Sequence, residues 1–141
     1  MDNSIVFEYN VDATDFTRAG EASSDIKKKL KEMGVSPEVV RKVAIAMYEG
    51  EINMVIHAKG GEIKVEITPE DIIMTLADVG PGIPDVEKAM QAGWSTAPEE
   101  VRNLGFGAGM GLPNMKKNTD SMEIETVIGK GTTIKMVVKM A

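Results

Sequence analysis

Four glycines at every second position constrain this chain more than any other feature of its sequence. They are Gly105, Gly107, Gly109 and Gly111. Glycines placed in this way leave backbone N–H groups free to surround phosphate oxygens, and the helix predicted to begin at Met110 adds the positive end of its dipole. The alternative explanation is a flexible loop that binds nothing.

Two better-known phosphate-binding motifs do not match the sequence. A dinucleotide-binding fingerprint follows directly after a strand, whereas residues 93–108 are polar and glycine-rich. A Walker A loop also fails, because Gly131 separates Lys130 from Thr132 and the leading glycine is missing. The glycine run therefore belongs to a different structural setting.

Two helices are predicted in the first part of the chain. Apolar residues recur at helical intervals in residues 14–33, which predicts a first helix ended by Gly34. A second helix begins at Ser36-Pro37-Glu38, because serine caps a helix, proline fits its first turn and an acidic side chain suits its positive end. This helix is expected to continue to Ala58.

Strand patterns occupy most of the remaining sequence. Residues 63–67 and 132–139 alternate between apolar and polar side chains, and residues 122–127 predict a strand that pairs with the latter. The nearly continuous apolar run 72–77 follows a turn at residues 68–71 and predicts a strand more buried on both faces, which forms a hairpin with residues 63–67. With an edge strand at residues 5–9 and a short helix at 85–91, the chain is expected to be α+β. The predicted architecture is a two-layer α/β sandwich with helices on one face of a sheet.

Composition excludes several classes of protein. A length of 141 residues suggests a single domain, residues 1–141. The 16 basic and 22 acidic residues give a net charge of −6, which argues against a nucleic acid partner. The absence of cysteine and the presence of one histidine exclude thiolate nucleophiles and multi-histidine metal sites. No segment is apolar enough to span a membrane and no signal peptide is visible, so we expect a soluble, cytoplasmic protein.

Two further clusters accompany the glycine run. Asp78 ends the apolar strand and is followed by Gly80 and Gly82, so a carboxylate can accept a hydrogen bond from a ligand while the backbone stays open to a flat ring. On the second helix, Glu49 and Asn53 are four residues apart and share one face. A carboxylate is suited to general-base chemistry and an amide oxygen to Mg²⁺. Taken singly, a turn and a solvated polar face explain these clusters more simply.

In combination and in this order, the clusters resemble the Bergerat-type ATP-binding fold of the GHKL family. This family includes histidine kinases, type II topoisomerases, Hsp90-type chaperones and mismatch-repair ATPases, and the fold has a mixed, mainly antiparallel sheet. Residues 78–96 and 107–117 are similar to the bacterial serine/threonine kinases that regulate sigma factors. The similarity is greater to the switch-kinase branch than to the sigma-sequestering anti-sigma branch.

The resemblance implies how a nucleotide would be held. Asn53 would bind Mg²⁺, and the ion would bridge phosphate oxygens of ATP. Asp78 would accept a hydrogen bond from the adenine amino group, with Thr132 nearby. Gly80 and Gly82 would let the base lie against the backbone.

The resemblance also implies a catalytic residue. The four glycines of residues 105–111 would surround the phosphates beneath a lid at residues 95–104. Glu49 would deprotonate the attacking hydroxyl of a partner serine or threonine. Gly50 is unusual inside a helix, and we expect it to allow close packing or a gap facing the nucleotide. Glu51 points away from the face of Glu49 and is not expected to be the base.

The resemblance implies an ATP-dependent serine/threonine protein kinase in a bacterial sigma-factor or stress-signalling switch. Its substrate would be a small antagonist protein of the sulfate-transporter/anti-sigma-antagonist type. Two alternatives stay open: an ATP-binding anti-sigma module that acts by association, and a detached histidine-kinase-like ATPase domain. A sigma factor, a PP2C-type phosphatase and a second copy of the chain are further partners that the resemblance allows.

Overall fold

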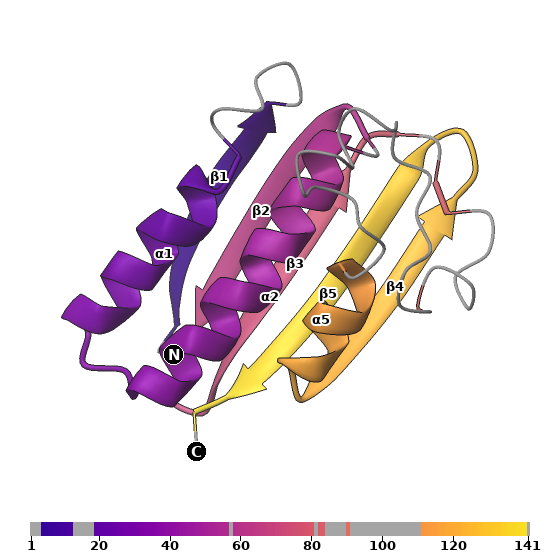
Figure 1. Cartoon of the computed structure of the whole chain (residues 1–141). Coiled ribbons are helices and arrows are strands. Elements are labelled where there is room, and N and C mark those ends of the chain that lie inside the picture. The colour runs from indigo at the N-terminus through magenta and orange to yellow at the C-terminus, as the bar shows by residue number, and fades with distance from the viewer. Residues whose placement is uncertain are drawn as a thin grey trace.

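The computed structural model describes residues 4–12, 19–56, 58–80, 82–83, 90 and 111–140. The elements follow in the order β1 (Ile5–Asp12), α1 (Glu21–Glu32), α2 (Pro37–Ile56), β2 (Gly60–Ile67), β3 (Asp71–Asp78), α5 (Gly111–Lys117), β4 (Ser121–Val127) and β5 (Gly131–Lys139). The strands form one sheet, and the three helices lie in front of it (Figure 1). The α+β class predicted from the sequence is confirmed.

The sheet has the strand order β1-β2-β3-β5-β4. All four pairings between the described strands are antiparallel. The two predicted hairpins are confirmed as β2–β3 and β4–β5, and β1 is an edge strand as expected. Because β3 pairs with β5, the end of β3 and the start of β5 lie next to each other, so Asp78 and Thr132 are brought together from distant parts of the chain.

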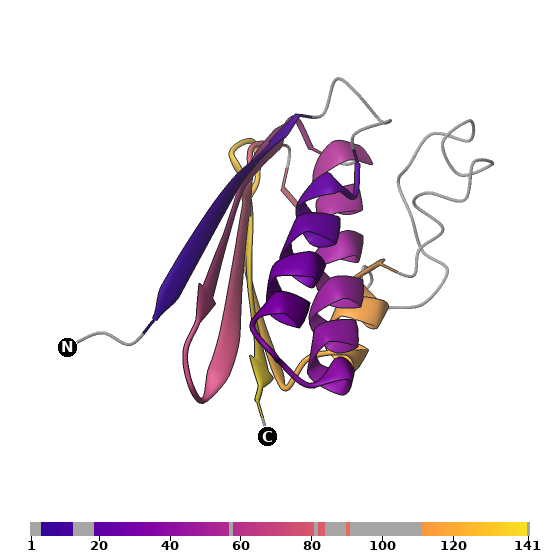
Figure 2. The same ribbon diagram turned by 90° about the vertical axis from the view of Figure 1, so that its left-hand side faces the viewer.

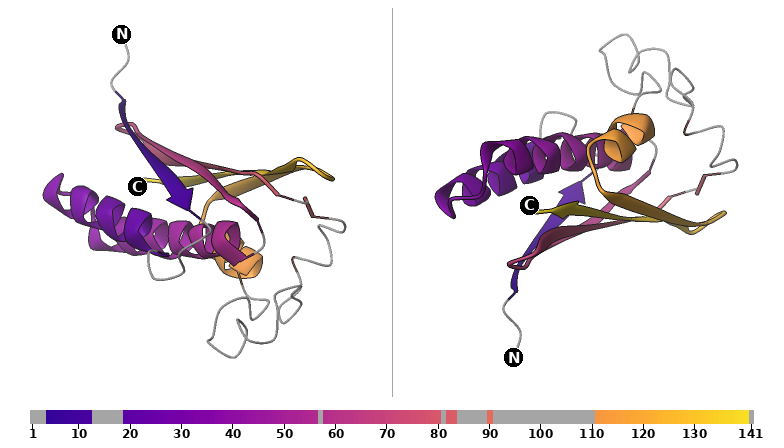
Figure 3. Two further views of the ribbon diagram at one scale, coloured as in Figure 1. Left: turned by 90° about the horizontal axis from the view of Figure 1, so that it is seen from above. Right: turned by 90° about the horizontal axis from the view of Figure 1, so that it is seen from below.

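The described helices α1, α2 and α5 all lie on the same face of the sheet (Figures 2 and 3). The strand burial follows this two-layer arrangement. In β3, Ile72, Met74 and Leu76 are buried, whereas the alternate residues Ile73 and Thr75 are half-buried. On β2, by contrast, the outer residues Glu62 and Lys64 are exposed, so β3 is the more buried of the two strands on its outer face, as predicted.

The second helix begins as the sequence predicts. The Ser36 hydroxyl accepts a hydrogen bond from the Val39 N–H at 3.4 Å, and Pro37 occupies the first helical position. The helix is described up to Ile56, two residues before the predicted end. Although this helix has 20 residues, neither it nor any other helix in the described ranges is long and apolar enough to cross a membrane.

The first helix begins later than predicted. Residues 19 and 20 form a turn, and α1 starts at Glu21. Gly20 has a positive φ of 99°, a left-handed conformation that a helix cannot continue through. The helix ends as expected before Gly34, which also has a positive φ. The periodic apolar pattern extended the predicted helix across a turn, because a pattern of side chains does not report backbone conformation.

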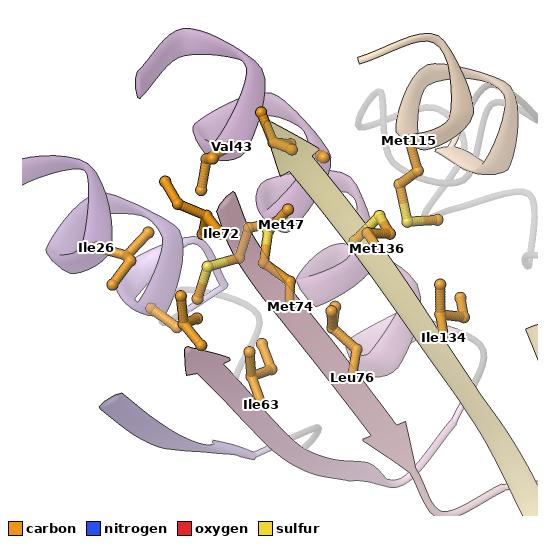
Figure 4. Close-up of a cluster of buried hydrophobic side chains, with 14 of the residues drawn as sticks. Ile26, Val43, Met47, Ile63, Ile72, Met74, Leu76, Met115, Ile134 and Met136 are labelled. Atoms are coloured by element: carbon orange, nitrogen blue, oxygen red, sulfur yellow. The ribbon is translucent and has the colours of Figure 1, made fainter. Parts of the chain in front are cut away.

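The core lies between the helices and the covered face of the sheet. It includes Ile26 of α1, Val43 and Met47 of α2, and Met74 and Met136 of the central strands (Figure 4). The many methionines of the sequence fill this interface, where a flexible side chain adapts to irregular gaps. The packing fixes α2 above β3, which sets the position of the polar side chains on that helix.

Candidate functional site

Asp78 lies where β3 ends, and its carboxylate faces the start of β5. Its Oδ1 accepts a hydrogen bond from the Thr132 N–H at 2.8 Å. Burial raises the pKa of Asp78 above its ordinary value, while the Thr132 N–H acts in the opposite direction. With Oδ1 engaged, Oδ2 is the oxygen that can accept a hydrogen bond from a ligand.

A second threonine supports this pair from β4. The Oγ1 atoms of Thr126 and Thr132 are 3.0 Å apart, within hydrogen-bond distance. The Ile83 N–H donates to Thr126 Oγ1 at 2.8 Å, so the segment that follows β3 is attached to the β4–β5 hairpin. Asp78, Thr132, Thr126 and Ile83 thus form one hydrogen-bonded group at this end of the sheet.

Glycines allow the backbone segments of this group to approach closely. Gly82 has a φ of +82°, and a Cβ added there would lie 2.9 Å from the carbonyl oxygen of Val127. Gly131 has a φ of +150°, and an added Cβ would lie 2.2 Å from the carbonyl oxygen of Asp78. Gly80 donates its N–H to the Lys130 carbonyl at 3.2 Å. A glycine at position 82 is therefore required by the packing of the protein's own backbone. The prediction that a ligand base lies against the backbone at Gly80 and Gly82 is a separate one and stays a prediction.

The other predicted side chains lie on α2. Glu49 and Asn53 are both half-buried and are one helical turn apart. The Asn114 side chain on α5 donates from Nδ2 to Glu49 Oε1 at 3.2 Å. The helix that starts at Gly111, the last of the four glycines, thereby contacts the proposed base directly.

Gly50 and Glu51, which follow Glu49, serve the fold. A Cβ on Gly50 would lie 2.3 Å from Leu76 Cδ2, so the missing side chain lets α2 approach β3. Of the two expectations for Gly50, the structure supports close packing. Glu51 is buried, and its carboxylate accepts hydrogen bonds from the backbone N–H groups of Gly20, Ala22 and Ser23 at 2.9–3.2 Å. It caps the start of α1 from the neighbouring helix.

Residues 13–138 match the family model described as the histidine kinase-like ATPase domain. The chain belongs to this family. The GHKL resemblance inferred from the three clusters is thus confirmed, and the match includes every candidate residue of the site.

Named relatives and a solved structure agree with this assignment. The anti-sigma F factor of Caldanaerobacter subterraneus subsp. tengcongensis is 36% identical over 104 residues, which cover 70% of this chain and 69% of that protein. The serine/threonine-protein kinase RsbT of Bacillus subtilis is 31% identical over 111 residues, which cover 76% of this chain and 77% of that protein. The mycobacterial sensor histidine kinase MprB shares the fold, with a TM-score of 0.54 and 16% identity, over 96% of this chain and 97% of that one.

Part of the predicted site lies outside the described residues of this histidine kinase-like ATPase domain. Gly105, Gly107 and Gly109 fall there, as do the expected lid at residues 95–104 and the expected helix at residues 85–91 apart from Met90. Gly111 is described as the first residue of α5. The described part of the site therefore consists of the hydrogen-bonded cluster around Asp78 and the polar face of α2.

Asn53 is the described residue that the resemblance assigns to Mg²⁺, and its surroundings fit that assignment. Among the described residues, no side chain hydrogen-bonds its amide, which leaves the amide oxygen available as a ligand. No group of three or more His, Cys, Asp or Glu residues in the described ranges could hold a metal ion. A single amide oxygen suits an ion that takes its remaining ligands from phosphates and water, as Mg²⁺ does.

Sequence reasoning missed Thr126 and Asn114 and gave Glu51 no role. Thr126 could have been found from the hairpin register, because it is paired directly with Thr132 across β4 and β5. Asn114 gives no such signal, since its partner Glu49 is 65 residues away in the chain. Glu51 is found only when the turn before α1 is known.

Proposed function

We propose that the chain binds ATP with Mg²⁺ and acts as a serine/threonine protein kinase in a partner-switching module. Its substrate would be a small antagonist protein of the anti-sigma-antagonist type. The observation that most directly supports nucleotide binding is the Asp78–Thr132 hydrogen bond, which holds a half-buried carboxylate with one oxygen left for a ligand. The support for kinase activity is a relative named as a serine/threonine-protein kinase.

In this proposal the nucleotide lies between α2 and the end of β3. Asp78 accepts a hydrogen bond from the adenine amino group, and the Thr132 hydroxyl lies beside it. The glycines of residues 105–111 surround the phosphates, and the Asn53 oxygen holds the metal. When bound, Mg²⁺ neutralises phosphate charge, which is a large part of what phosphoryl transfer requires.

Glu49 is the proposed general base. Its Oε1 accepts from Asn114, which leaves Oε2 to accept the proton of a serine or threonine hydroxyl on the partner. The hydroxyl oxygen forms a bond to the γ-phosphorus while the bond to the bridging oxygen breaks. ADP leaves, and the proton stays on Glu49. Because the hydroxyl must reach Glu49, the partner segment must approach the face of α2 that carries Glu49 and Asn53.

A second candidate function is control of a sigma factor by association. It is favoured by a relative of this chain named anti-sigma F factor, at 36% identity. In that case ATP would set the shape of the binding surface, and turnover would be slow. A PP2C-type phosphatase and a second copy of the chain are further proposed partners, and we propose a cytoplasmic location. A detached histidine-kinase-like ATPase domain is the third candidate.

Phosphoryl transfer from Mg-[γ-³²P]ATP to candidate antagonist proteins separates these functions. Wild-type protein is expected to label a serine or threonine, and Glu49→Gln is expected to lower the rate by about 10²–10⁴-fold, the usual contribution of a general base. Nucleotide affinity should not change. Glu62→Gln is the matched control, because this exposed glutamate lies on β2. Confirmed ATP binding with no labelled partner would favour association, and a phosphohistidine product would favour the third candidate.

A further inference from the structure

Four side chains at four-residue intervals form one ridge along α2, the helix that lies between α1 and α5 (Figure 1). They are Arg41, Ile45, Glu49 and Asn53. Residues four apart on a helix share one face, and each step rises about 6 Å along the axis. Glu49 and Asn53 have proposed roles as base and metal ligand. Ile45 and Arg41 continue the ridge beyond the base and have no role so far.

A small exposed apolar surface lies on this ridge at Ile45. Ile45 is 36% exposed and Tyr48 is 40% exposed, and the two are neighbours on the helix surface because they are three residues apart. The Tyr48 ring also contacts the start of α1, since a Cβ added to Gly20 would lie 3.1 Å from Tyr48 Cε1. An aliphatic side chain beside a packed aromatic ring is the kind of surface that anchors a protein partner.

Arg41 adds a positive charge that has no acidic partner among the described residues. It is exposed, and neither an ion pair nor a hydrogen bond joins its guanidinium to another described side chain. Glu38, the carboxylate one turn earlier, pairs instead with Lys42 Nζ at 3.5 Å. An exposed arginine without a carboxylate partner, in a chain of net charge −6, is complementary to an acidic group on another molecule.

The proposed metal ligand sets the direction in which a partner segment runs. In the proposed function, Mg²⁺ and the phosphates occupy the side of Glu49 on which Asn53 lies. A segment whose hydroxyl reaches Glu49 therefore continues toward Ile45 and then Arg41, about 6 Å and 12 Å away along the helix axis. An extended segment covers these distances in about two and four residues.

We propose that Arg41, Ile45 and Tyr48 form the docking surface for the acceptor segment of the partner protein. This segment carries an apolar side chain about two residues from the acceptor serine or threonine, which packs on Ile45 and Tyr48. An acidic side chain about four residues from the acceptor pairs with Arg41. The inference rests on the proposed kinase function and adds the substrate chemistry that the site selects.

The test measures kcat and KM of phosphoryl transfer to the antagonist protein that the wild-type chain labels. Arg41→Glu is expected to raise KM for that protein about tenfold or more, because it sets like charges against each other. Ile45→Ser should raise KM about fivefold through the lost apolar contact. The kcat at saturating partner and the calorimetric ATP affinity should not change in either variant, and Arg41→Lys should restore most of the KM difference.

Lys64→Glu is the matched control for the change of charge. Lys64 is exposed on β2 between the buried residues Ile63 and Val65, so its side chain lies on the face of the sheet opposite the helices (Figure 2). Its KM for the partner should equal that of the wild type.

Each outcome decides the proposal. An Arg41→Glu protein with unchanged KM overturns it, as does a Lys64→Glu protein with an equal rise. A changed oligomeric state of Arg41→Glu in analytical ultracentrifugation also overturns it, by assigning the surface to a second copy of the chain. If Arg41→Glu does not fold, Arg41→Gln makes the same comparison. Wild-type protein that labels no partner overturns the proposed kinase function and this inference with it, whereas labelling with unchanged KM overturns this inference alone.

Discussion

Asn114 on α5 donates a hydrogen bond from Nδ2 to Oε1 of Glu49 on α2, across 3.2 Å. Because α5 begins at Gly111, this bond connects the end of the glycine run to the carboxylate proposed as the base. A carboxylate held through one oxygen presents the other in a fixed direction. The bond therefore relates the position of α5, which follows the proposed phosphate-binding glycines, to the orientation of Glu49.

The Asn114→Ala variant is expected to lower the rate of phosphoryl transfer about tenfold, the effect of losing one hydrogen bond of roughly 1.4 kcal/mol. ATP affinity should change little, since the side chain contacts Glu49 and not the proposed nucleotide. Rates at saturating ATP and calorimetric affinities measure the two quantities. Asn118→Ala is the control, because the Asn118 side chain donates to the Asn114 carbonyl at 2.8 Å and stabilises the same helix. An equal loss of rate in both variants would assign the effect to helix stability.

Gly50→Ala is expected to destabilise the protein although alanine favours a helix. The gain in helix propensity is about 1 kcal/mol. Against it, the new Cβ would lie 2.3 Å from Leu76 Cδ2 and 3.3 Å from Met115 Sδ in a buried contact, and such overpacking costs about 1–3 kcal/mol. We expect a net loss near 1 kcal/mol in urea unfolding. A Leu76→Ala background should remove the overpacking, so the double variant should lose less than the sum of the single ones. Additive losses would show that the contact is not the cause.

The sequence predicts the parts of this fold that depend on local patterns. The Ser36 cap, the β2–β3 and β4–β5 hairpins and the position of Asp78 at a strand end all follow from spacing and turn chemistry. The start of α1 does not, because it depends on the turn at residues 19 and 20 and on the distant Glu51 that hydrogen-bonds to the backbone there. Among site residues, Glu49, Asn53 and Asp78 belong to sequence motifs. Thr126 needs the register of the β4–β5 hairpin, and Asn114 acts through a partner 65 residues away.

Asp78→Asn is expected to separate stability from ligand binding. Burial raises the folded-state pKa of Asp78 above its ordinary value of 3.8. The stability associated with this group is therefore fully present below pH 3.8 and is lost as the pH rises through the folded pKa. Asparagine carries no charge and keeps an oxygen for the Thr132 N–H. The variant should thus be at least as stable as the wild type at pH 7, and its advantage should shrink toward pH 4.

The same variant should lose ATP affinity about a hundredfold, because the asparagine amide places a donor where the adenine amino group needs an acceptor. Thermal unfolding between pH 4 and 7 and calorimetry at pH 7 measure the two effects. Asp71→Asn at the other end of β3 is the control for a change of charge on this strand. A variant that is less stable than the wild type at pH 7, or that binds ATP normally, contradicts the assignment.

Glu51→Gln should lower the free energy of unfolding by about 2 kcal/mol, because hydrogen bonds to a buried charged group are lost. The Glu51 carboxylate accepts from three backbone N–H groups at the start of α1. An amide offers one oxygen and turns its NH₂ toward a backbone donor, so part of this cap is lost. Urea unfolding measures the effect.

Glu49→Gln is the matched comparison, because Glu49 lies two residues earlier on the same helix and accepts one side-chain hydrogen bond. It should change stability by less than about 0.5 kcal/mol, as for most substitutions outside the core, and should lower the rate of phosphoryl transfer by about 10²–10⁴-fold. Glu51→Gln should show the reverse pattern. Its stability should fall, while the folded protein should keep its phosphoryl transfer. If Glu51→Gln abolished transfer in fully folded protein while Glu49→Gln did not, the base would have to be reassigned to Glu51. The carboxylate would then have to leave the start of α1 during turnover.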